Sequence, residues 1–169
     1  MPAERQAPRG LVGRLARAWT RPLDAARGLA DLPEPAVLAL LLGTMVVYFM
    51  AQWPGHARSA ALDPSVPMQA RLGGALLATM FIMPLVVMAV AALAALAIRA
   101  LGGRIEGRHS RIALVWALAA AAPVMLLGGL TQGLIGPGAA LTLVHAAAGA
   151  AFVIFWAAGL RAFVRRGPA

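Results

Sequence analysis

The feature that most constrains this chain is an uninterrupted apolar run over residues 72–101. No residue between Arg71 and Arg99 is charged, and Thr79 carries the only hydroxyl of the run. Because a bilayer span needs about 20 apolar residues, the run predicts a transmembrane helix. A continuous helix of this length would measure about 45 Å against a hydrocarbon core of about 30 Å. We therefore expect it to tilt, to bend or to extend into the interface.

A proline at position 84 lies in the first half of this run. Proline donates no backbone hydrogen bond, and its ring clashes with the preceding turn. We therefore expect a kink before Pro84, with a carbonyl near Met80 left without its helical donor. One long kinked helix and two shorter pieces are both compatible with this pattern.

Three further apolar runs, at about residues 36–53, 112–130 and 139–160, are long enough to cross a bilayer. The Trp53-Pro54-Gly55 sequence predicts that the first of them ends at an interface. Since 61% of the residues are apolar, a soluble fold would lack a polar surface. We expect an all-α polytopic membrane protein, with about four transmembrane helices in residues 33–164. The other three spans are expected to be partners of the long run.

The segment before the spans has two parts. Residues 1–9 are polar and are expected to be disordered. Residues 10–32 predict an amphipathic cytoplasmic helix, which Pro22 would divide into two short ones. Its candidates for contact with a lipid surface are Arg14, Arg17, Trp19 and Arg21. Such a segment suits an anionic membrane surface, and the alternative is a helix packed against the cytoplasmic side of the bundle.

The basic residues, all of them arginine, are distributed unevenly along the chain. Thirteen of the 15 lie before residue 30, between residues 99 and 111, or from residue 161 onward, where 165–169 form a basic tail. Basic residues favour cytoplasmic connections, so four spans with both termini in the cytoplasm satisfy this distribution. The expected location is the bacterial inner membrane. The net charge of +9 then indicates contact with anionic lipid, and no nucleic-acid partner is expected.

Few side chains inside the predicted spans can carry chemistry. The intramembrane polar candidates are His145 and Thr79, and no Asp, Glu or Arg is expected at bilayer depth. His145 could relay a proton or bind a ligand, or it could donate a hydrogen bond to a neighbouring helix. His56 and His109 fall on opposite sides of the membrane, and cysteine is absent. We therefore expect no metal site, no cofactor and no catalytic residue.

Other residues predict helix packing and anchoring. Small residues at Gly73-Gly74, Gly128-Gly129 and positions 146–151 allow close contact between helices. Three tryptophans near span ends are expected to anchor the helices at the interfaces: Trp53, Trp116 and Trp156.

Several short segments together carry a family resemblance. They are FMAQWP at 49–54, LDPSVP at 62–67, ARLGGALL at 70–77, SRIALVWA at 110–117 and LIGPGAALTL at 134–143. Over about residues 10–165 the chain resembles the small bacterial branch of the Yip-domain family, named for eukaryotic relatives that interact with Rab/Ypt GTPases. The resemblance implies a membrane bundle without catalytic residues. The eukaryotic role does not transfer, because the Asp-Leu-Tyr-Gly-Pro signature is absent and the eukaryotic pattern has five spans.

The leading expectation is therefore a non-enzymatic integral inner-membrane protein that acts through membrane lipids, a membrane-protein partner or a homo-oligomer. The alternative is a small permease, a channel or an accessory subunit of a membrane complex. A permease needs a polar path, for which the candidates are Thr44, Thr79, Gln132, Thr142 and His145. A polar cavity at the bilayer midplane would favour transport, whereas a packed bundle with an exposed small-residue face would favour binding.

Overall fold

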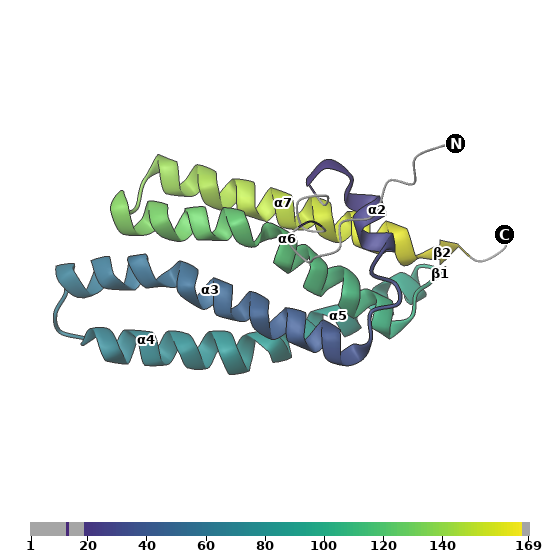
Figure 1. The fold of residues 1–169 in the computed structure, drawn as a ribbon, viewed down its shortest axis with the longest axis horizontal. Coiled ribbons are helices and arrows are strands. Elements are labelled where there is room, and N and C mark those ends of the chain that lie inside the picture. The colour runs from purple at the N-terminus through teal and green to yellow at the C-terminus, as the bar shows by residue number, and fades with distance from the viewer. Residues whose placement is uncertain (1–12, 14–18, 167–169) are drawn as a thin grey trace.

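A computed structural model describes residue 13 and residues 19–166, which fold into a helical bundle (Figure 1). The elements are α2 (Pro22–Arg27), α3 (Glu34–Leu62), α4 (Met68–Leu77), η1 (Ala78–Ile82), α5 (Met83–Ala100), β1 (Gly103–Arg104), α6 (Gly107–Leu134), α7 (Ala139–Phe163) and β2 (Arg165–Arg166). Within this part of the chain, four helical segments are long and apolar enough to cross a membrane: α3, the continuous α4–η1–α5, α6 and α7. The expected all-α architecture is confirmed. Residues 1–9, Arg14 and Arg17 lie outside the described residues.

The irregularity expected before Pro84 is present as the π-helical turn η1. The backbone N–H of Met83 donates to the carbonyl of Ala78, five residues earlier. Pro84 has no N–H to offer to Met80, so a wider turn accommodates the lost hydrogen bond. The segment stays one long helix from residue 68 to residue 100 instead of dividing in two.

The prediction that the first span ends at Trp53-Pro54-Gly55 is wrong, because α3 continues through Pro54 to Leu62. Prolines are tolerated inside membrane helices where neighbouring helices support the opened turn. Here α6 supplies that support. A Cβ built on Gly133 of α6 would lie 2.3 Å from the Pro54 Cβ, so the two helices touch at this proline.

The centre of the bundle is α6, and the long run at 72–101 lies at its outside. Figure 1 shows α6 beside α7 and above α3, and α6 also contacts α5. In the most apolar 18-residue window of each span, 67% of the residues are buried in α6 but 17% in α4–η1–α5. Lipid tails solvate large apolar side chains as well as protein does, so the most apolar helix gains little from a central position.

Two of the long helices begin, and two others finish, at the same end of the bundle. There α3 and α6 begin, α5 and α7 finish, and β1 pairs antiparallel with β2, with Gly103 opposite Arg166. We name this the arginine-rich end, for its residues Arg99, Arg104, Arg108, Arg111, Arg161, Arg165 and Arg166. Among the described residues, the opposite end holds Arg58 and Arg71.

The core lies in the half of the bundle next to the arginine-rich end. Trp116 is 1% exposed and sits in this core with Leu41, Met45 and Phe155. The expectation that Trp116 is an interface anchor is therefore wrong, because its side of α6 faces other helices. Its indole N–H has no hydrogen-bond partner among the described residues.

Helix α2 packs against α7. Ala26 and Leu29 are buried, and the ring of Trp19 meets Phe155 edge-on with centroids 5.1 Å apart. Trp19 remains 49% exposed, and Arg21 is also exposed. Residues 19–30 therefore pack against the bundle.

Candidate functional site: a groove between α3 and α6

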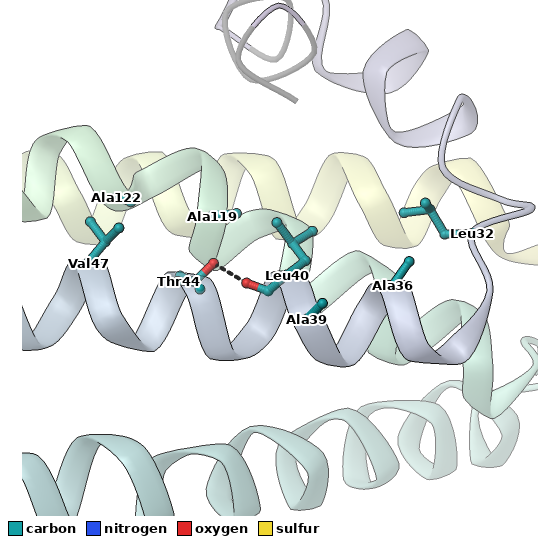
Figure 2. A pocket seen from close by; sticks show the side chains of 9 residues that line it. Leu32, Ala36, Ala39, Leu40, Thr44, Val47, Ala119 and Ala122 are labelled. Carbon is teal, nitrogen blue, oxygen red and sulfur yellow. Dashed lines mark hydrogen bonds between the residues drawn. The ribbon is translucent and has the colours of Figure 1, made fainter. Parts of the chain in front are cut away.

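A half-open groove of about 560 Å³ runs between α3 and α6 in the half nearer the arginine-rich end (Figure 2). It is lined by Leu32, Ala36, Ala39, Leu40, Gly43, Thr44, Val47, Ala119 and Ala122. Leu40 and Val47 point from α3 toward α6. Ala119 and Ala122 are buried, whereas Ala39 and Gly43 are exposed. The groove thus has an apolar floor and an open side.

Small side chains at helical spacing create the groove. Ala36, Ala39 and Gly43 are three and four residues apart, so they share one face of α3. A Cβ built on Gly43 would meet nothing within 4 Å, so the space beside it is open. On α6 the last lining residue is Ala122. The next residue, Pro123, removes the N–H that would bond to Ala119, and Figure 1 shows α6 bent along its length.

Farther along the same pair of helices the gap closes to backbone contact. A Cβ on Gly129 would lie 1.7 Å from the carbonyl oxygen of Ala51, so only glycine fits. Gly129 and Gly133 form a G-x-x-x-G pattern, opposed by Ala51 and Gly55 at the same spacing on α3. Close packing was expected at Gly128-Gly129, but the four-residue spacing of Gly129 and Gly133, which marks this crossing, was not recognised.

Two arginines lie at the mouth of the groove. The Arg108 Nη2 donates to the carbonyl of Leu32, a lining residue, at 2.5 Å. Arg111 forms an ion pair with Glu34, two residues before the lining residue Ala36. Among residues 19–166, Arg108 forms no ion pair, and its Nε is buried without a hydrogen-bond partner. Within the described part of the chain, the mouth therefore carries one guanidinium group that forms no ion pair with a carboxylate.

The polar residues considered for a transport path are dispersed, and two of them bond to their own helix. The hydroxyl of Thr44 donates to Leu40 O at 2.7 Å, and that of Thr142 donates to Gly138 O at 3.1 Å. Gln132 packs beside Gly55 at the helix crossing. Of these candidates Thr44 alone lines the groove, and its hydroxyl is already bonded to its own helix.

The two intramembrane polar candidates lie apart from the groove. Thr79 is buried in η1 and accepts a hydrogen bond from the Gln52 Nε2 at 3.0 Å. His145 is exposed on α7, and its ring lies over Gly128, where a Cβ would be 3.2 Å from the His145 Cδ2. Within residues 19–166, His145 has no hydrogen bond that would orient it for proton transfer.

Two further polar contacts between helices were not anticipated. The hydroxyl of Tyr48 on α3 donates to Leu118 O on α6 at 3.0 Å, five residues before Pro123. The hydroxyl of Ser110 on α6 donates to Ala91 O on α5 at 2.7 Å and is fully buried. A hydroxyl in an apolar span that can reach a neighbouring helix was the available signal. Both bonds fix how α6 sits against its neighbours.

The remaining titratable side chains occupy the two ends. In the connection between α3 and α4, hydrogen bonds from Ser65 and Arg71 lower the pKa of the Asp63 carboxyl. At the arginine-rich end His109 stacks on Phe163, with ring centroids 4.8 Å apart. Across the described part of the chain, no three His, Cys, Asp or Glu side chains group where they could hold a metal ion.

Comparison with known proteins adds no assignment. No family model, no curated protein and no solved structure matches the chain. The groove, its two arginines and the tight glycine crossing therefore carry the functional argument.

Proposed function

We propose that this chain is a non-enzymatic integral protein of the bacterial inner membrane, of Yip-domain type, that acts through contacts with lipids or with another membrane protein. In this proposal both termini and the arginine-rich end lie in the cytoplasm. Basic residues favour the cytoplasmic side of a membrane, and the described part of the chain finishes with β2 at the arginine-rich end. The groove between α3 and α6 is the contact site.

The observation that carries the proposal is the apolar character of that groove. A transport path needs polar groups that face a shared cavity, because each ion or solute must exchange its water for protein ligands. The groove instead offers alanine, glycine, leucine and valine side chains, and its single hydroxyl is bonded to its own helix. Such a surface suits an acyl chain or a helix more than a polar solute.

The test uses the full chain purified in mild detergent, with Gly43→Leu as the variant. Leucine at position 43 would extend into the open side of the groove, and nothing lies within 4 Å of the added Cβ. Gly149→Leu is the matched control, because Gly149 on α7 is equally open and lies outside the groove. We expect Gly43→Leu to lose most of the lipid or protein that co-purifies with wild type and Gly149→Leu to retain it.

Two results would contradict the proposal. One is an unchanged set of co-purifying molecules in Gly43→Leu. The other is release of an entrapped polar solute from proteoliposomes that contain the wild-type chain but not from empty ones.

Orientation is tested by cysteine labelling, which is clean because the chain has no cysteine of its own. Gln69→Cys at the start of α4 should react with an impermeant maleimide in intact spheroplasts. Glu106→Cys at the arginine-rich end should react only after the membrane is permeabilised. The reverse pattern would place the termini outside the cytoplasm.

A further inference from the structure

We infer that the groove between α3 and α6 holds one acyl chain of an anionic phospholipid whose phosphate lies at Arg108. The inference rests on the contact function proposed above and names the occupant of the same site.

The length of the groove matches one leaflet of a bilayer. From Ala36 to Val47 the lining covers eleven helical steps of α3, or about 16 Å at about 1.5 Å per residue. Half of a hydrocarbon core of about 30 Å is about 15 Å. The volume of about 560 Å³ lies in the range of small-molecule sites, about 300–1,000 Å³. An acyl chain lying along α3 would therefore meet apolar side chains over its whole depth.

The charge at the mouth selects the headgroup. Arg108 lies beside Leu32, at the end of the groove that faces the arginine-rich end, and its charge has no carboxylate partner among the described residues. The charge of Arg111 is offset by Glu34. Guanidinium groups bind phosphate through charge-assisted hydrogen bonds, and basic pockets between membrane helices bind anionic headgroups. A lipid with net negative charge therefore gains an attraction that a zwitterionic lipid does not.

The same charges disfavour a second copy of the chain as the occupant. Two copies in one membrane, related by an axis along the bilayer normal, would place their arginine-rich ends side by side. Arg108 of each copy would then face a surface of like charge, which opposes association. An anionic headgroup neutralises that charge instead.

The experiment is native mass spectrometry of the full chain in detergent, titrated with equal amounts of phosphatidylglycerol and phosphatidylcholine of the same acyl chains. We expect wild type to retain about fivefold more phosphatidylglycerol, since one arginine near a headgroup contributes about 1 kcal/mol. Arg108→Gln should bind the two lipids equally. Glu34→Gln should raise the preference further, because it frees the charge of Arg111.

Control variants test whether the changes in lipid binding come from the charge of Arg108 and from the space beside Gly43. Arg161→Gln removes an exposed arginine of the same end of the bundle that does not line the groove, and it should keep the wild-type preference. Gly43→Leu should reduce binding of both lipids, and Gly149→Leu should not.

Equal retention of both lipids by wild type, or an undiminished preference in Arg108→Gln, would overturn the inference. If Gly43→Leu still lost both lipids in that case, the contact function would stand without charge selection.

Disulfide-linked dimers formed by Gly43→Cys in membranes would also overturn the inference of a bound lipid, because a second copy would occupy the groove. That result would support the protein-contact form of the proposed function. If Gly43→Leu and Gly149→Leu bound both lipids like wild type, inference and proposed contact site would fail together.

Discussion

Helix α6 and the segment α4–η1–α5 are both apolar and long enough to cross a membrane, yet they occupy opposite positions in the bundle. The buried face of α6 consists largely of alanine and glycine, whereas the outer segment exposes Phe81, Leu85 and Leu93. Apolar character brings a segment into the membrane, and the placement of its small residues then decides where it packs, because small residues let helices approach to dispersion contact. The central helix is the one whose small residues, such as Ala119 and Gly129, face neighbouring helices, whereas Gly73 and Gly74 of the outer segment are exposed.

The largest expected effect concerns the closest backbone contact of α6. Gly129→Leu would force α3 away from α6, since even a Cβ would lie 1.7 Å from Ala51 O. Overpacking costs about 1–3 kcal/mol where side chains can yield, and here the opposing atom is backbone, so we expect more than about 3 kcal/mol. Size-exclusion chromatography in mild detergent should show no folded species. Gly74→Leu on α4, with nothing within 4 Å, should elute like wild type.

The next effect distinguishes the two segments by cavity formation. Trp116→Ala should destabilise the fold by about 3–5 kcal/mol, because the ring is buried in the core. Phe81→Ala on η1 should cost less than about 0.5 kcal/mol, because the ring is 66% exposed. Thermal unfolding in detergent should resolve them at about 2–4 °C per kcal/mol. A comparable fall for Phe81→Ala would show that the outer segment is covered by a partner.

The hydrogen bond between α6 and α5 gives the next effect. Ser110→Ala removes the bond to Ala91 O and should cost about 1 kcal/mol, visible as a lower melting temperature. Ser59→Ala is the control, because the Ser59 hydroxyl bonds to Gly55 O of its own helix. Equal falls in melting temperature for the two variants would mean that the hydrogen bond between α6 and α5 adds no stability beyond that of a bond within one helix.

The contact between α3 and η1 is expected to be weaker still. A double-mutant cycle with Gln52→Leu and Thr79→Val should give a coupling energy of about 0.6 kcal/mol, the average for hydrogen bonds between membrane helices. Unfolding of the four proteins measures it. A coupling energy near zero would mean that the hydrogen bond between Gln52 and Thr79 does not stabilise the contact of η1 with α3.

The smallest effect concerns His145, which rests on α6 without a hydrogen bond among the described residues. His145→Leu should change stability by less than about 0.5 kcal/mol, because a leucine can lie over Gly128 in its place. Accumulation in the membrane should equal that of wild type. Loss of accumulation would reveal a structural partner for the imidazole.

The sequence by itself determined that the chain forms four long apolar helices and that an irregular turn precedes Pro84. Both are local properties: an uncharged run of sufficient length selects a helix in lipid, and a proline disturbs the turn before it wherever it lies. The grouping of arginines at one end also follows from the order of spans along the chain.

Only the tertiary structure decided which helix is central, how α3 passes through Pro54 and where a groove remains open. These features depend on faces of distant segments meeting: Gly133 beside Pro54, Gly129 on Ala51, and Arg108 beside Leu32. In lipid the hydrophobic effect does not rank one apolar helix face above another. Close packing therefore decides which helix faces meet. It depends on the fit between two surfaces, so it cannot be predicted from either segment alone.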